Sequence, residues 1–324
     1  MLAGGKGRRL AVAVGMLVLV PAVAPRVEAQ RIEYSAAIGA SRGTFVFSEP
    51  TTSWVLDQGL VLAAGWWRLG ANLPLVMQNS SAITFIGGLP LPTGGPYSGV
   101  LRGRSSGSTI PMRGRRGSGS GAGTGGSIVA DARLAGVADA VAAPPLASLV
   151  DSGAVESPGP FSTRVGDPVL RAEAELSRGD ATRVGARILA KLPLADPSSG
   201  IGTGAFDYGA GLSVAASIDR TFFFADVDHW VLGDMPELPL RDLTSASLGA
   251  GFAFGAQGRL SALASVSGAT AIVDNVSAPL SAGASLGLAV RPERFITVGA
   301  TIGLSESAPD WSLTLGWRVS LRDR

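Results

Sequence analysis

The fold is decided by the stretch Trp311-Ser312-Leu313-Thr314-Leu315-Gly316-Trp317-Arg318-Val319-Ser320-Leu321. Apolar side chains occupy every second position of this stretch, and small or polar side chains occupy the positions between them. Successive side chains of an extended strand point to opposite faces, so the alternation predicts a β-strand with one apolar face and one polar face. The stretch is also roughly twice as long as the five or six residues usual for a strand in a soluble protein.

The same alternation recurs along most of the chain. The expected strands are 32–48, 50–65, 66–78, 166–177, 181–194, 205–219, 220–232, 242–256, 257–269, 279–291, 294–304 and 310–321. A strand that crosses a bilayer at about 45° needs about 9–11 residues, which these strands supply. The pattern predicts an all-β fold, a transmembrane antiparallel up-and-down β-barrel of about twelve strands with an apolar lipid face and a polar lumen. The barrel must be closed because lipid cannot satisfy a free strand edge.

The connections between these strands alternate in length. Tight turns are expected at Gly65-Trp66, 178–180, Asp219-Arg220, Gln257-Gly258 and 291–293. The connections that alternate with them are longer after the first, and the longest is 79–165. Bacterial outer-membrane barrels have short periplasmic turns, longer extracellular loops and an even number of strands. We therefore expect both ends of the barrel in the periplasm and 79–165 outside the cell.

Composition excludes several functional classes. The chain has no cysteine and one histidine, His229, which excludes disulfide scaffolds, thiolate zinc sites, cysteine nucleophiles and multi-histidine metal centres. Only 16% of the residues are charged. Basic and acidic residues nearly balance once 1–29 are set aside, so we expect no nucleic-acid partner. The sequence also predicts no cofactor and no metal site.

Residues 1–29 have the pattern of a signal peptide. A basic cluster at 6–9 precedes an apolar run at 10–20, and Val27-Glu28-Ala29 has the small residues of a cleavage site. Cleavage after Ala24 is one alternative, and a membrane anchor is another. The short apolar run favours export, and no later run reaches the roughly 18 apolar residues of a spanning helix. We therefore expect export to the outer membrane of a Gram-negative cell and a barrel domain from 30 to 324.

Most of the chain outside roughly 79–160 resembles the outer-membrane "transporter" family associated with the meta-pathway of phenol degradation. The matching motifs are Leu73-Pro74-Leu75-Val76, Gly166-Asp167-Pro168, Lys191-Leu192-Pro193, Gly202-Thr203-Gly204, Asp207-Tyr208, Leu232-Gly233-Asp234 and Gly303 to Trp311. None of these motifs is catalytic. The resemblance implies an outer-membrane barrel that passes small hydrophobic or aromatic molecules. One departure is the end of the chain, where Leu321 and three charged residues replace the terminal aromatic residue that barrel assembly machinery recognises.

The long connection 79–165 lacks periodicity where it is richest in glycine and serine, around 117–127. Such a composition predicts a flexible loop. The loop either stays on the cell surface or folds inward as a plug, as in other barrels. Its basic patch consists of Arg102, Arg104, Arg113, Arg115 and Arg116. These arginines are either solvated or bind lipopolysaccharide or acidic solutes.

Charged residues on the polar faces of the strands are the candidate functional residues of the lumen. They are Arg171, Glu173, Glu175, Arg187, Lys191, Asp207, Asp226, Asp228 and Arg318. Because buried charges need partners, we expect Asp226 and Asp228 to pair across the lumen with Arg171, Arg187 or Lys191. Aromatic residues at strand ends suggest either interfacial girdles or a buried core. They are Trp66, Trp67, Phe222, Phe223, Phe224, Trp230, Trp311 and Trp317.

An enzymatic function has little support in the sequence. A hydrolase would need a base beside its nucleophile, and His229 is the one imidazole present. Alternation places His229 opposite Asp226 and Asp228, so we expect it to face lipid near a strand end. The carboxylates Glu173 and Glu175 suggest a glycosidase pair, but neighbouring lumen positions explain them without chemistry.

Three functions therefore remain. The first is a passive outer-membrane channel or transporter for small, hydrophobic or aromatic molecules. The second is a non-conducting adhesion or scaffold barrel whose long loop binds partners. The third, and least supported, is an outer-membrane hydrolase. The expected partners are membrane lipid, lipopolysaccharide, small-molecule solutes and the barrel assembly machinery.

Overall fold

The computed structural model describes residues 31–47, 49–86, 89–93, 159–196, 200–235, 238–274, 276–291 and 293–322. The predicted signal peptide lies outside these residues, as do the glycine- and serine-rich sequence around 117–127 and the five arginines near it. The predictions of a signal peptide, of a flexible loop and of a basic patch that binds lipopolysaccharide or acidic solutes therefore stay untested. No helix in the described ranges has the length and apolar character needed to cross a membrane.

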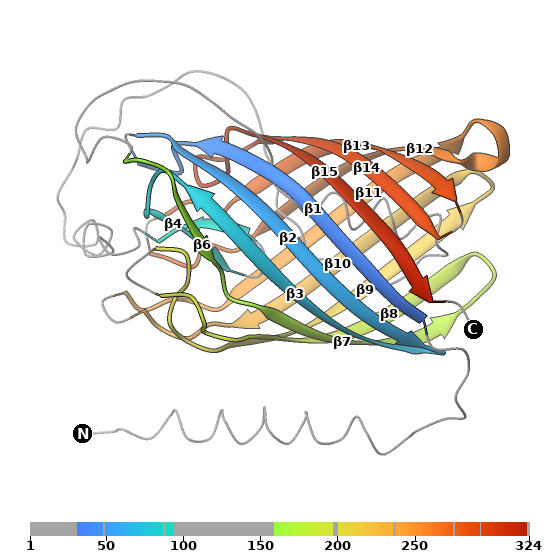
Figure 1. Ribbon diagram of the computed structural model, residues 1–324, viewed down its shortest axis with the longest axis horizontal. Coiled ribbons are helices and arrows are strands. Elements are labelled where there is room, and N and C mark those ends of the chain that lie inside the picture. The colour runs from blue at the N-terminus through green and yellow to red at the C-terminus, as the bar shows by residue number, and fades with distance from the viewer. Residues whose placement is uncertain are drawn as a thin grey trace, which may run out of the picture.

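Twelve long strands form the wall of the described barrel (Figure 1). They are β1 (Arg31–Gly43), β2 (Thr51–Ala64), β3 (Trp67–Gln78), β7 (Val169–Arg178), β8 (Thr182–Lys191), β9 (Asp207–Ile218), β10 (Thr221–Val231), β11 (Leu243–Phe254), β12 (Leu260–Ala269), β13 (Leu280–Arg291), β14 (Arg294–Gly303) and β15 (Trp311–Arg322). Each strand pairs antiparallel with the wall strands before and after it, and β1 pairs with β15, as in Ala36 opposite Trp317. The wall is therefore closed, which confirms the predicted fold.

Three short strands lie in the connection expected to be a loop, so that expectation was wrong for these residues. β6 (Ser162–Val165) pairs with β3 directly beyond β7, so the two segments form one wall strand interrupted at Gly166-Asp167-Pro168. β4 (Ile83–Ile86) and β5 (Leu89–Pro92) form a separate hairpin. Both β4 and β5 are short apolar runs that are buried on nearly every side, so they show no alternation of apolar and polar residues.

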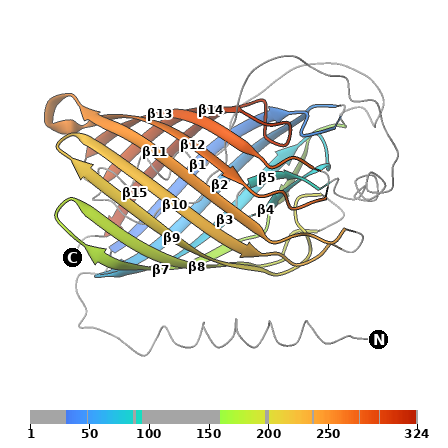
Figure 2. The same cartoon turned by 180° about the vertical axis from the view of Figure 1, so that it is seen from behind.

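The two ends of the barrel differ as predicted (Figure 2). At the end that we call the base, β1 begins, β15 ends and the turns between strands are short. One base turn consists of Asp219 and Arg220, and Asp219 has a φ of 54°. Aspartate tolerates this left-handed conformation, which a two-residue turn requires. The longer connections all lie at the opposite end, which we call the mouth; β4 and β5 lie there as well.

The wall is apolar outside and polar inside. In β14, Ile296, Val298 and Ile302 are exposed on the outer face, whereas Thr297 and Thr301 are buried on the inner face. Val298 is 53% exposed and Thr297 is 2% exposed. A soluble protein has the reverse distribution. An apolar outer surface around a polar interior is the distribution of a barrel in lipid.

The aromatic side chains divide between the two faces. Phe222, Phe224 and Trp230 are buried on the inner face of β10, so they form no girdle. Phe223 lies between the two phenylalanines and is exposed on the outer face, and Trp66 is exposed at a base turn. Of the two alternatives for these residues, the buried core therefore holds for Phe222, Phe224 and Trp230, because the period of two sends neighbouring rings to opposite sides.

Candidate functional site in the lumen wall

A buried ion-pair group lies on the inner face of β8 and β10. Arg187 Nε and Nη2 donate to the two carboxylate oxygens of Asp228 at 2.7 and 2.8 Å, and Arg187 Nη1 donates to Asp226 at 3.1 Å. The three side chains are at most 4% exposed. The two-pronged contact matches the planar guanidinium to a carboxylate and fixes both side chains.

Glycine at position 211 permits this contact across an intervening strand. Arg187 and Asp228 are both register partners of Gly211, which lies between them on β9. A Cβ atom at position 211 would lie 1.8 Å from Asp228 Oδ1. The absence of a side chain leaves the space through which the guanidinium and the carboxylate meet. The expected pairing of Asp226 and Asp228 with one of three basic residues is confirmed for Arg187. The pair follows the wall across β9 and does not cross the lumen as expected.

A second group surrounds Lys191 at the mouth end of β8. Lys191 Nζ lies 2.7 Å from Asp207 Oδ2, 3.3 Å from Asp167 Oδ2 and 2.6 Å from Thr203 Oγ1. The remaining oxygens of the two carboxylates accept backbone hydrogen bonds, Asp167 from Ala195 and Asp207 from Gly233. Residues of three other motifs thus meet the ammonium group of Lys191, and Gly233 of a fifth motif binds one of them, Asp207. The group ties two mouth connections and the break between β6 and β7 to the wall.

A third group lies on β2, β3 and β7. Arg171 Nη2 donates to Asn72 Oδ1 at 2.9 Å, and Asn72 Nδ2 donates to Asp57 Oδ2 at 2.8 Å. Arg171 also lies 3.5 Å from Glu173. Glu175 is farther toward the base, where it pairs with the exposed Arg178. Glu173 and Glu175 therefore have separate basic partners, which does not resemble a pair of catalytic carboxylates acting on one bond.

The remaining candidates lie apart from these groups. Arg318 follows Ser312 and Thr314 along the same face of β15, opposite Phe295 of β14. His229 is exposed on the outer face of β10, where its Nδ1 lies 2.9 Å from Thr244 Oγ1. Among the described residues, no three or more histidine and acidic side chains are placed to hold a metal ion.

An apolar cluster occupies the mouth, and the sequence analysis did not find it. The hairpin contributes Ile86, Leu89 and Leu91, which are at most 5% exposed. They share this cluster with residues from the wall and from the connections at the mouth, namely Trp230, Leu232, Met235, Leu238, Leu240, Leu243, Ile272 and Val273. We call this group the mouth cluster. It packs the hairpin against the connections at the mouth.

Polar contacts hold the same hairpin to the connection between β8 and β9. Thr84 Oγ1 donates to the carbonyl oxygen of Gly200 at 2.9 Å and lies 2.6 Å from Thr93 Oγ1. The backbone N–H of Phe85 donates to Ile201 at 3.4 Å. The hairpin is therefore bonded to a mouth connection, and in the described structure neither β4 nor β5 pairs with a wall strand.

A second apolar cluster lines the inner face near the base. It consists of Phe222, Phe224, Leu263 and Phe295, which come from β10, β12 and β14. The Phe224 ring lies over Gly249 of β11, where an added Cβ would be 2.3 Å from the ring. We call this group the base cluster. Glycines in the neighbouring strand are the one sequence signal that predicts room for such rings.

Small hydroxyl side chains cover much of the inner wall outside the two clusters. They are Ser213, Ser245, Ser247, Ser261, Ser265, Ser267, Ser281, Ser285, Thr297, Thr301, Ser312 and Thr314. The inner wall is thus apolar at the mouth, polar and charged along its length, and apolar again near the base.

The fold is similar to that of a solved outer-membrane channel, and two further solved barrels match with lower scores. An outer-membrane channel from Pseudomonas putida F1 is 10% identical, with 93% of this chain and 98% of that chain covered and a TM-score of 0.53. The KdgM porin is 6% identical, with 90% and 99% covered and a TM-score of 0.42. The toluene transporter TodX of Pseudomonas putida is 13% identical, with 94% and 92% covered and a TM-score of 0.35. Comparisons with protein-family models and with curated proteins give no match.

Proposed function

We propose that this protein lies in the outer membrane of a Gram-negative cell and passes small molecules through its barrel. The observation that carries the proposal is the reversed distribution of side chains in a closed wall, with leucine and valine outside and serine, threonine and ion pairs inside. Lipid requires a closed strand wall of this kind. The fold shared with the outer-membrane channel of Pseudomonas putida F1 supports the same function.

The inner wall favours small solutes with apolar or aromatic bodies. Twelve strands give a size between eight-stranded barrels, which side chains fill, and porins of 16–18 strands, which hold an aqueous channel. The mouth cluster and the base cluster offer apolar contacts at both ends. The motif resemblance to the family associated with phenol degradation supports the same class of solute.

The second candidate function is a non-conducting scaffold barrel. The observation that favours it is the position of the β4–β5 hairpin, whose Ile86 and Leu91 are buried in the mouth cluster. A hydrolase is disfavoured because His229 and the inner-face hydroxyls lie on opposite sides of the wall.

Transport is tested with the purified protein in planar bilayers and proteoliposomes. We expect ion conductance above that of bare lipid, and uptake of phenol that exceeds uptake of glucose. The comparison adds a variant without residues 100–130, together with liposomes that hold no protein. Conductance that rises after the deletion supports a channel constricted by its long loop. The absence of both conductance and uptake in both forms would contradict the proposal and favour the scaffold barrel.

A further inference from the structure

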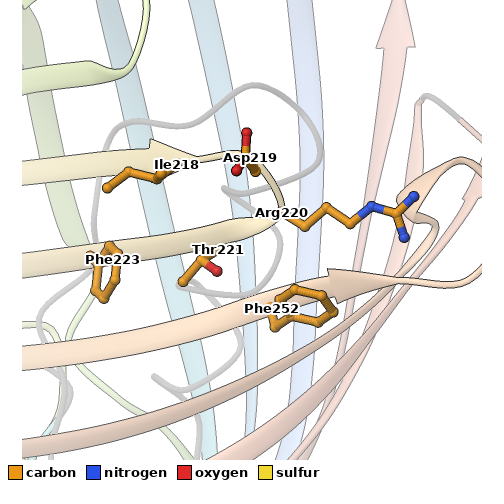
Figure 3. Close-up of a pocket in the computed structure, with 6 residues that line it drawn as sticks. All are labelled: Ile218, Asp219, Arg220, Thr221, Phe223 and Phe252. Carbon is orange, nitrogen blue, oxygen red and sulfur yellow. The ribbon is translucent and has the colours of Figure 1, made fainter.

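A hollow lies on the outer face of the barrel at the base, away from the lumen (Figure 3). Its volume is about 450 Å³, within the range of roughly 300–1,000 Å³ that is common for small-ligand sites. The hollow spans three neighbouring strands, β9, β10 and β11. Six residues line it, namely Ile218, Asp219, Arg220, Thr221, Phe223 and Phe252.

The register of the strands explains why this part of the wall is hollow. Thr221 is the register partner of both Ile218 and Phe252, so a small side chain lies between two large ones. Phe223, two residues further along β10, closes the hollow on the side toward the membrane centre. Ile218, Phe223 and Phe252 are each more than 40% exposed on the lipid-facing surface. The small side chain of Thr221 therefore forms the bottom of the hollow, and the apolar side chains of Ile218, Phe223 and Phe252 form three of its sides.

The fourth side is the base turn, which carries one charge of each sign. Asp219 and Arg220 occupy the turn between β9 and β10, and Figure 3 shows their side chains pointing in different directions. Neither side chain forms an ion pair with any of the described residues. A free cation and a free anion thus lie beside an apolar hollow at the level where the lipid face of the strands ends.

We propose that this hollow binds one zwitterionic phospholipid of the periplasmic leaflet, of the phosphatidylethanolamine type. An acyl chain lies over Thr221 between Phe223 and Phe252. The Arg220 guanidinium donates to the lipid phosphate, and the Asp219 carboxylate accepts from the ammonium group. Charge-assisted hydrogen bonds of this kind are the strong ones, and guanidinium suits a phosphate. The inference rests on the proposed membrane location and is independent of transport.

The test is native mass spectrometry of the full chain, delipidated in detergent and titrated with palmitoyl-oleoyl phosphatidylethanolamine or phosphatidylglycerol. We expect one phosphatidylethanolamine molecule per barrel, and weaker binding of phosphatidylglycerol, which lacks the ammonium group. The variants R220Q, which removes the phosphate contact, and T221W, which fills the hollow, should each weaken phosphatidylethanolamine binding about fivefold or more. D219N should lower phosphatidylethanolamine binding to the level of phosphatidylglycerol.

Two matched controls separate this site from general lipid contact. R259Q removes an arginine from the next base turn, where Arg259 donates to Gln257. A264W adds a tryptophan to the exposed outer face of β12. Both should bind phosphatidylethanolamine as the unchanged protein does. Equal binding of the two lipids, or equal binding by R220Q and R259Q, would overturn the inference. Phenol uptake is measured on the same samples. Its result tests the transport proposal independently of the lipid-binding result.

Discussion

At the scale of single residues, neighbouring side chains and glycines determine which partners the charged side chains of the inner wall reach. Arg187 reaches Asp228 because Gly211 leaves the space between them open. Lys191 is held by Asp167 and Asp207, whose other oxygens bind the backbone of mouth connections. The charges along β8 are therefore satisfied by the wall itself, which lowers the cost of placing them inside a membrane protein.

Replacing Arg187 by methionine should strongly destabilise the barrel. The change leaves Asp226 and Asp228 buried without their cation, and loss of one partner of a buried pair typically costs about 3–5 kcal/mol. Urea unfolding in lipid vesicles, followed by tryptophan fluorescence, measures the change in the free energy of unfolding. The triple variant R187M/D226N/D228N should recover most of the loss, since it removes the uncompensated charge.

The control for that prediction is R178M. Arg178 pairs with Glu175 at the base, but its side chain is 62% exposed. Exposed pairs contribute about 0–1 kcal/mol, so R178M should change the free energy of unfolding little. Equal effects of R187M and R178M would show that the buried group does not stabilise the wall as we describe.

At the scale of elements, the wall strands and the β4–β5 hairpin are positioned by different forces. The wall strands are fixed by their backbone ladders and by an alternating pattern that sends apolar residues to lipid. The hairpin is held by the mouth cluster and by a few contacts, among them Thr84 to Gly200. Because these contacts are few, we expect the hairpin to be displaced more easily than any wall strand.

Replacing both Leu89 and Leu91 by asparagine should increase conductance in planar bilayers. The two side chains are buried in the mouth cluster, and an amide there has no hydrogen-bond partner to repay its desolvation. The hairpin should therefore leave the cluster more often. The matched control is L194N, since Leu194 is 71% exposed in a mouth connection. If L89N/L91N and the unchanged protein conduct equally, the hairpin does not limit passage.

At the scale of the whole molecule, the outer surface requires an apolar environment. Every long strand of the described wall except β8 exposes at least one leucine, valine, isoleucine or phenylalanine side chain on the outer surface. A soluble monomer rarely exposes a contiguous apolar patch of more than a few hundred Å². A surface of this kind in water would cause association of molecules through their outer faces.

The protein without residues 1–29 should therefore be folded and monomeric in detergent micelles and should aggregate in plain buffer. Size-exclusion chromatography with light scattering, combined with circular dichroism, measures both properties. A folded monomer in buffer without detergent would contradict the membrane location, and with it the lipid site and the transport function.

Much of the wall could be predicted from the sequence. The expected strand 310–321 is β15 within one residue at each end, and 166–177 and 220–232 lie close to β7 and β10. The short turns at the base were also found. The face of each strand could be read because the period of two is local: it depends on the extended backbone and not on which strand lies beside it.

The partners of the charged residues could not be predicted. The sequence suggests three basic candidates for Asp226 and Asp228, and register selects Arg187. The base cluster was missed because its rings come from alternate strands and fit over glycines of the strands between them. The hairpin was missed because its short buried runs have no alternating pattern.

The sequence alone determined that this chain forms a closed barrel with an apolar outer face, since lipid and an extended backbone leave few other ways to satisfy such a pattern. Only the tertiary structure decided which inner side chains meet, what lies in the mouth, and where the outer wall is hollow. Those features arise between residues far apart in the chain, and their contacts depend on register and on the space that glycine and threonine leave open.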